Sequence, residues 1–282
     1  MNHNLRGFTL IELMVSLAIG LLVALAAVQM FVTNQQSFNL QRGMGDVQDN
    51  GRFALDFIGR DARMADLRPA GGQPMGRGVV MLTSDTVGAT ATTISLDDST
   101  ALGIGSSDQL TIQYAATPYS DRDCEGNQAP GNSVIVNRYF VRADAAGNSL
   151  AALACDGGYY NLTTKATTGL GDQGVVLLSS VDSFQVLYGV NDGTLTGCEP
   201  TRFLTATQVK ALAGTPAIVA MKVGVLVRSQ DTTGTLPASP GFQVLDKTLT
   251  AGQVPVDGRV RRLFTASMAM RNSTPDACKI WG

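Results

Sequence analysis

The sequence predicts an α+β protein in which a long N-terminal helix precedes a large, antiparallel, β-rich globular head. Three observations support this fold class. An apolar stretch passes into an amphipathic pattern that meets no proline before Pro69. The chain contains 31 glycines and only 16% charged residues, a composition typical of short strands joined by many turns. Two segments of the second half alternate apolar and polar residues with a period of two.

The charge balance and the histidine count exclude several kinds of function. Lys and Arg total 21 and Asp and Glu total 23, so the basic surface of a dedicated nucleic-acid-binding domain is not expected. His3 is the one histidine of the sequence and precedes the apolar stretch. A Ser-His-Asp or Cys-His catalytic arrangement and a His-ligated zinc site are therefore not expected in the head.

The apolar stretch from Leu13 to Val28 is long enough to cross a bilayer as one helix. No charged residue occurs between Glu12 and Arg42. Arg6 and the starting amine favour a cytoplasmic N-terminus, which predicts that the chain after about residue 33 is exported.

A cleaved secretory signal and a simple membrane anchor are alternative interpretations of this stretch. Ala24-Leu25-Ala26 offers a small-x-small cleavage site to a signal peptidase. Glu12 argues against both alternatives, because a carboxylate within an apolar span costs roughly 2.5 to 3.5 kcal/mol and neither gains from it.

The run Gly7-Phe8-Thr9-Leu10-Ile11-Glu12 resembles the type III signal of type IV pilins and pseudopilins. The resemblance implies that a prepilin peptidase removes the cytoplasmic leader, residues 1–7, by cutting after Gly7 and then methylates Phe8. The apolar helix would be kept. Glu12 lies in the first helical turn, where the helix dipole favours a negative charge, and in a filament it could pair with the Phe8 amine of a neighbouring subunit and fix the axial register.

The helix is predicted over residues 8–67, with residues 8–32 in the membrane or filament core and residues 33–67 packed on the head. Pro69, Gly71 and Gly72 end the pattern. Three glycines each weaken the middle of the helix by about 1 kcal/mol relative to Ala, which predicts bending or fraying there. These glycines are Gly43, Gly45 and Gly51.

The β-rich head is predicted over residues 73–282. Apolar residues alternate from Val219 to Val227, with Lys222 and Arg228 on the opposite, solvated face, and they alternate again from Phe264 to Met270. Thr205 and Gln208 form a capping box that predicts a short helix. The predicted strands are residues 79–82, 92–96, 109–114, 133–142, 175–190, 217–228 and 260–271.

Three further stretches resemble PilW-type minor pilins, which are similar in turn to the J-type pseudopilin of type II secretion. They are residues 55–65, 181–190 and 258–264. Many relatives continue the first stretch with Gly-Tyr, whereas this chain has Asp66-Leu67. The resemblance implies a lollipop-shaped, type IV pilin-like fold.

Four cysteines lie in the exported part, so two disulfides are the leading interpretation. Of the three possible connectivities we favour Cys124 with Cys155, which brackets a turn-rich region, and Cys198 with Cys278, which would tie down the C-terminus. Asp121, Asp123 and Glu125 are interpreted as a solvated acidic loop. We expect no metal, no cofactor and no catalytic residue.

The resemblance implies a structural filament subunit that helps to prime type IV pilus assembly at or near the filament tip. Its expected partners are the prepilin peptidase, other minor pilins, the major pilin and a large PilY-type tip adhesin. It would reside in the inner membrane, with a periplasmic head, before assembly and in the extracellular pilus afterwards. A type II secretion pseudopilin is the first alternative function, and an anchored envelope enzyme is the alternative from another class.

Overall fold

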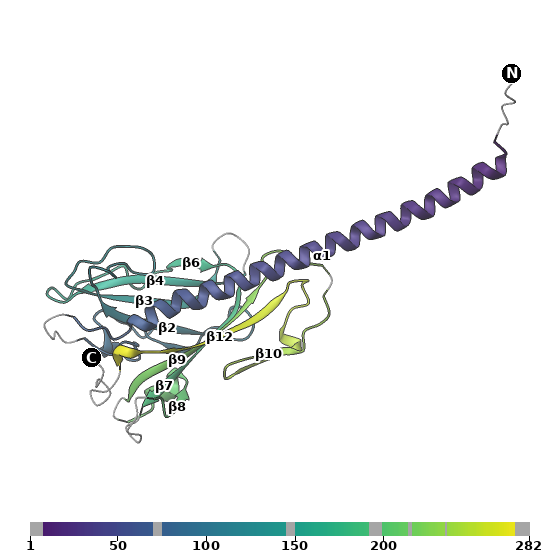
Figure 1. Cartoon of the computed structure of the whole chain (residues 1–282). Helices are drawn as coiled ribbons and strands as arrows, with labels where there is room; N and C mark the ends of the chain where they lie inside the picture. The colour runs from purple at the N-terminus through teal and green to yellow at the C-terminus, as the bar shows by residue number, and fades with distance from the viewer. Residues whose placement is uncertain are drawn as a thin grey trace.

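The protein has a long helix and an antiparallel β-rich head, the predicted fold class. The computed structural model describes residues 8–69, 75–144, 150–191, 199–213, 216–234 and 236–273. Helix α1 (Leu10–Met64) is continuous, and Figure 1 shows its first half projecting away from the head and its second half lying against the sheets.

Local hydrogen bonds set both ends of α1. At its start, the Thr9 side chain accepts from the Glu12 backbone N–H, and the Glu12 carboxylate accepts from the Thr9 backbone N–H at 3.0 Å. At its end, Ala65 is extended and Asp66 has a positive φ of 61°. The Asp66 N–H then bonds to the carbonyl of Gln113. Compared with the predicted residues 8–67, the helix begins at Leu10 because Thr9 caps it, and it ends at Met64 because the chain then turns into the head.

The glycines of α1 do not interrupt it, so the predicted fraying is wrong. Gly43 and Gly51 are buried, and a Cβ atom at either would overlap a head side chain, Thr233 or Phe264 respectively. Gly45 faces open space. Packing against the head offsets the low helix propensity of glycine, because the missing side chains let the backbone approach the strands closely.

Among the described residues, the first sheet contains six antiparallel strands. Five follow the order β1-β2-β3-β4-β5, and β6 also pairs with β4, at other residues of β4 than β5 does. Its central strands are buried along most of their length. The strands are β1 (Leu96–Thr100), β2 (Ser107–Ala115), β3 (Ser133–Ala143), β4 (Ala151–Asn161), β5 (Thr167–Thr168) and β6 (Val175–Leu178).

The second sheet, within the part of the chain that the structure describes, contains four antiparallel strands in the order β12-β9-β7-β8. Helix α1 packs on β12 and β9, and β7 packs on the first sheet, so helix and sheets share one core. A separate hairpin covers part of the outer face of β9. The strands are β7 (Val181–Asn191), β8 (Arg202–Leu204), β9 (Ala217–Arg228) and β12 (Arg261–Ala269), and the hairpin is β10 (Gly241–Val244) with β11 (Lys247–Thr250).

Most predicted strands are present, with informative differences. β9 has the predicted bounds, and the predicted segment 175–190 is two strands, β6 and β7. Residues 79–82 form only an isolated bridge from Val79 to Ile112. Strand β4 was not predicted, because its alanines and adjacent glycines have low strand propensity and become a strand through burial between neighbours.

The capped short helix was predicted correctly, but one strand face was not. Helix α2 (Ala206–Lys210) has Thr205 as its N-cap and Gln208 in the capping box. Arg228 was predicted on a solvated face, yet it is 1% exposed. Its guanidinium is paired with Asp182 at 2.6 Å, so the polar positions of β9 include a buried ion pair.

Candidate functional site

The processing segment lies at the free end of α1. Phe8 precedes the helix and is 91% exposed, and Glu12 lies in the first turn. One Glu12 carboxylate oxygen accepts from the Thr9 backbone N–H at 3.0 Å and from the Thr9 hydroxyl at 2.9 Å. Gly7 lies outside the described residues. The predicted cleavage, methylation and register roles of Gly7, Phe8 and Glu12 remain predictions.

The projecting half of α1 is apolar and uncovered. Every residue from Leu10 to Phe38 is exposed. Within the described residues, α1 contains a stretch apolar enough to cross a membrane, and none of that stretch is buried in the head. So large an apolar surface must be covered by lipid or by neighbouring subunits, because water would otherwise contact all of it.

The embedded half of α1 ends at a buried carboxylate. Asp61 is 1% exposed, and it accepts hydrogen bonds from the Tyr139 hydroxyl at 2.6 Å and from the Asn137 amide. Arg60 lies 3.6 Å away at the surface. Burial raises the pKa of the Asp61 carboxyl, and the hydrogen bonds from Tyr139 and Asn137 oppose the shift. This cluster joins the last turns of the helix to β3.

A second buried cluster joins the strands of the second sheet. Asp182 in β7 accepts from Arg228 of β9 at 2.6 Å and from Arg261 of β12 at 2.7 Å. Arg228 also donates to the carbonyls of Ala151 and Ser179. These hydrogen bonds offset much of the desolvation of the ions, although Nε of Arg228 is buried without a partner among the described residues, and the cluster links the three strands.

Each of the three stretches that resemble PilW-type proteins contributes one residue to these two clusters. Residues 55–65 contribute Asp61, residues 181–190 contribute Asp182, and residues 258–264 contribute Arg261. Sequence reasoning did not assign roles to these residues. For Asp61 and Asp182 the signal that could have found them is an acidic residue inside an otherwise apolar stripe or strand, which requires a buried partner.

One expected disulfide is present. Cys124 and Cys155 are bonded, with their Cα atoms 6.2 Å apart, which joins the β2–β3 loop to β4. This is the pair that the sequence favoured. Cys198 and Cys278 lie outside the described residues, and their pairing remains a prediction.

Comparison with known proteins identifies two segments. Residues 138–272 match the family model described as type IV pilus-assembly protein W, and residues 2–28 match the prokaryotic N-terminal methylation motif. Among solved structures, a type IV-like pilin from Thermus thermophilus matches with 16% identity and a TM-score of 0.45, covering 81% of this chain and 97% of its own. No curated protein sequence matches the chain significantly.

The two family matches, together with the exposed apolar helix, show that the chain is similar to type IV pilin-like proteins. Residues 138–272, slightly under half of the chain, are similar to minor pilins of the PilW type. The family implies processing by a prepilin peptidase and interaction with other pilins.

Proposed function

We infer that this chain is a minor pilin, a low-copy subunit that helps to prime type IV pilus assembly at or near the filament tip. The observation that carries the inference is the exposure of every residue from Leu10 to Phe38 beside a fully packed head. A helix of that kind is suited to an anchor in the inner membrane and then to a bundle of similar helices.

The position near the tip is supported by the size of the head. The predicted head of residues 73–282 is long compared with what closely stacked helices leave room for on each subunit. A subunit of this size is more easily placed where the filament ends. Other minor pilins, the major pilin and a PilY-type adhesin are the proposed neighbours, and prepilin peptidase is the proposed processing enzyme.

Glu12 has two separable roles in this proposal. Its carboxylate caps its own helix through Thr9, and its charge would meet the methylated Phe8 amine of a neighbouring subunit. A matched ion pair inside an apolar filament core fixes register, because an unpaired charge there is costly.

Substitution of Glu12 separates these roles. Glu12→Gln keeps an oxygen that accepts from Thr9 but removes the charge, whereas Thr9→Val removes the hydroxyl of the cap and keeps the charge. We expect Glu12→Gln to reduce incorporation into sheared filaments at least about tenfold and Thr9→Val to reduce it much less, since the desolvated pair is worth more than about 1.4 kcal/mol.

Immunoblots of sheared filaments and of membranes measure incorporation and expression, and mass spectrometry establishes whether each mature chain begins at methylated Phe8. Equal incorporation of Glu12→Gln and the parent at equal membrane abundance would show that the charge has no register role. A mature chain beginning after the apolar helix would contradict the whole proposal.

The type II secretion alternative uses the same signal and helix. A deletion strain distinguishes the two functions. Loss of twitching with intact protein secretion supports the pilus assignment, and the reverse result assigns the chain to secretion. The anchored-enzyme alternative has no supporting observation in the described residues beyond the shared anchor.

A further inference from the structure

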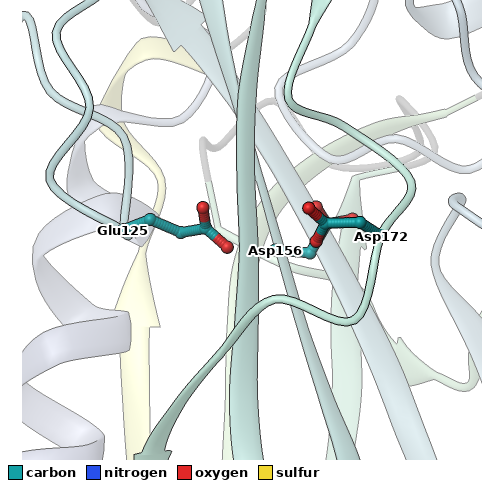
Figure 2. Close-up of side chains that lie close together, drawn as sticks. All are labelled: Glu125, Asp156 and Asp172. Carbon is teal, nitrogen blue, oxygen red and sulfur yellow. The ribbon is translucent and has the colours of Figure 1, made fainter.

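Three carboxylates from distant parts of the sequence meet on the head. Glu125 belongs to the β2–β3 loop, Asp156 to β4, and Asp172 to the β5–β6 loop. One carboxylate oxygen from each lies within 4.8 Å of the others. Figure 2 shows the Glu125 carboxylate directed toward the other two. They define an acidic cluster that the sequence could not indicate, because its members are far apart along the chain.

Asp156 brings to this cluster a carboxylate that the protein satisfies only in part. The residue is 0% exposed. Its Oδ2 accepts from the Arg138 guanidinium at 2.8 Å and from the Gly171 N–H at 2.9 Å. Its Oδ1 has no hydrogen-bond partner among the described residues. A buried carboxylate oxygen without a partner is costly, so a bound cation would satisfy a group that the protein itself does not.

The charge of the cluster also favours a cation. Three carboxylates face one guanidinium, that of Arg138. Burial raises the pKa of Glu125, and the nearby Asp172 and Asp123 raise it further. Burial likewise raises the pKa of Asp156, although Arg138 opposes the shift. Three negative charges held so closely against a single guanidinium repel one another, and a divalent cation would reduce the repulsion.

The disulfide holds two of the three carboxylates in place. Glu125 directly follows Cys124, and Asp156 directly follows Cys155. The loop around Glu125 is shaped further by Asp123, whose carboxylate accepts from the backbone N–H groups of Glu125 and Asn127 at 3.0 and 2.9 Å. The ligand positions are therefore fixed before any ion arrives, which lowers the entropic cost of binding.

Asp172 is fixed by the loop on the other side. Its Oδ1 accepts from the Gly174 N–H at 2.6 Å, and its backbone carbonyl accepts from Arg138 at 2.6 Å. Gly171, which precedes it, donates to Asp156. The β5–β6 loop is thus tied to β3 and β4 with an exposed carboxylate at its tip.

We propose that Glu125, Asp156 and Asp172 bind a calcium ion. Calcium takes oxygen ligands at 2.3–2.6 Å in flexible geometry, so oxygens on opposite sides of the ion are about 4.8 Å apart, as the cluster allows. Magnesium requires a tighter octahedron, and zinc prefers the nitrogen and sulfur ligands that this cluster lacks. Waters would complete the coordination shell. The site departs from the expectation that the chain binds no metal and that Glu125 belongs to a solvated loop.

Binding would join the β2–β3 loop to the β5–β6 loop across β4. Three carboxylates partly neutralised by Arg138 fit the affinity range of extracellular calcium modules, about 0.1 to 1 mM. The ion would therefore stabilise the exported head where calcium is abundant, whether or not the chain acts at a pilus tip.

The test uses the full chain in detergent micelles after removal of metal with a chelator. Titration calorimetry with calcium chloride measures affinity, and thermal unfolding followed by circular dichroism measures stability. We expect the melting temperature to rise with calcium up to about 10 mM and to rise much less with magnesium at equal concentration. No heat of binding and no stabilisation by calcium over that range would overturn the proposal, as would an equal response to magnesium.

Two substitutions distinguish a calcium site from a purely structural cluster. Glu125→Gln and Asp172→Asn should each weaken calcium binding at least about tenfold, because each removes a charged ligand. Without metal, neither should melt below the parent, since each relieves repulsion. Asp121→Asn is the matched control from the same loop, with its carboxylate bonded to Gln128 instead, and it should bind calcium normally. Unchanged affinity in both ligand variants would contradict the assignment.

Discussion

The two halves of α1 share one backbone but depend on different surroundings. From Leu10 to Phe38 every side chain is exposed, whereas the later half buries Val47, Ala54, Ile58 and Ala62 in the core of the head. The embedded half is stabilised within the chain. The projecting half has no such support, so its apolar surface requires a membrane or other subunits. The difference shows which part of the molecule encodes its fold and which part encodes its assembly.

The glycines of the helix also differ in whether they contact the head. Gly43 and Gly51, in the embedded half, would collide with head side chains if they carried a Cβ, whereas Gly20 and Gly45 face open space. The embedded glycines are therefore packing positions. Gly20 can matter only to a neighbour that is outside the chain.

The largest effect is expected at Asp61. Asp61→Ala leaves Tyr139 and Asn137 without their acceptor inside the core and creates a small cavity. We expect the free energy of unfolding of the head to fall by about 3 to 5 kcal/mol. Urea denaturation of the micellar full chain, followed by circular dichroism, measures the loss.

Because only the embedded half of α1 contacts the head, the Asp61 substitution should destabilise that half and not the projecting half. Hydrogen exchange should accelerate in the embedded half of α1 and in β3, while the projecting half inside the micelle stays protected. Asp56→Ala is the control, because Asp56 is exposed on the same helix, and it should change stability by less than about 0.5 kcal/mol. A loss at Asp61 as small as the control's would mean that the junction does not depend on the buried carboxylate.

The next largest effect is the pH dependence of folding stability that Asp108 causes at the contact between the two sheets. Asp108 in β2 accepts from the backbone N–H of Val186 in β7 at 2.9 Å, so its carboxylate links the sheets beneath the embedded helix. Burial, with smaller contributions from Asp97 and Asp246, raises the pKa of Asp108 from 3.8 to about 7.

A raised carboxyl pKa means that the folded state holds the proton more tightly than the unfolded chain. The stabilising contribution of Asp108 is therefore fully present below pH 3.8 and is lost as the pH rises through about 7. Between pH 5 and 7 the loss of folding stability due to Asp108 is on the order of 2 kcal/mol. We expect the slope of stability against pH in that range to be more positive in Asp108→Asn than in the parent. Parallel profiles of the two proteins in urea denaturation would contradict the assignment.

The sequence predicted the elements that carry a local signal. The apolar run, the capping box at Thr205 and the alternation in β9 all depend on neighbouring residues, so their elements were recognisable. The end of α1 was not, because Asp66 leaves the helix to bond with Gln113 of a distant strand. Strand β4 was missed for the same reason, since its burial arises from strands on both sides.

The candidate sites also differ in how far the sequence could predict them. The processing motif is contiguous and could be read directly from Gly7 to Glu12. The clusters around Asp61 and Asp182, and the three carboxylates around Asp156, are formed by residues far apart in sequence. An acidic residue within an apolar pattern indicates that a partner exists, but only the fold identifies the partner.

The smallest expected change in stability concerns the glycines of α1 and tests whether those in the embedded half are packing positions. Gly51→Ala gains about 1 kcal/mol of helix propensity but forces the Phe264 ring to move, at a typical cost of about 1 to 3 kcal/mol. We therefore expect a net change in stability between none and a loss of about 2 kcal/mol.

Gly45→Ala, in the same half of the helix but facing open space, should instead raise stability by up to about 1 kcal/mol. Gly20→Ala should leave the unfolding of the head unchanged, because the head does not contact it. Equal gains at Gly45 and Gly51 in urea denaturation would show that the embedded half tolerates a side chain where close approach is proposed. A loss of filament incorporation in Gly20→Ala, with normal head stability, would place a neighbouring subunit against the projecting half.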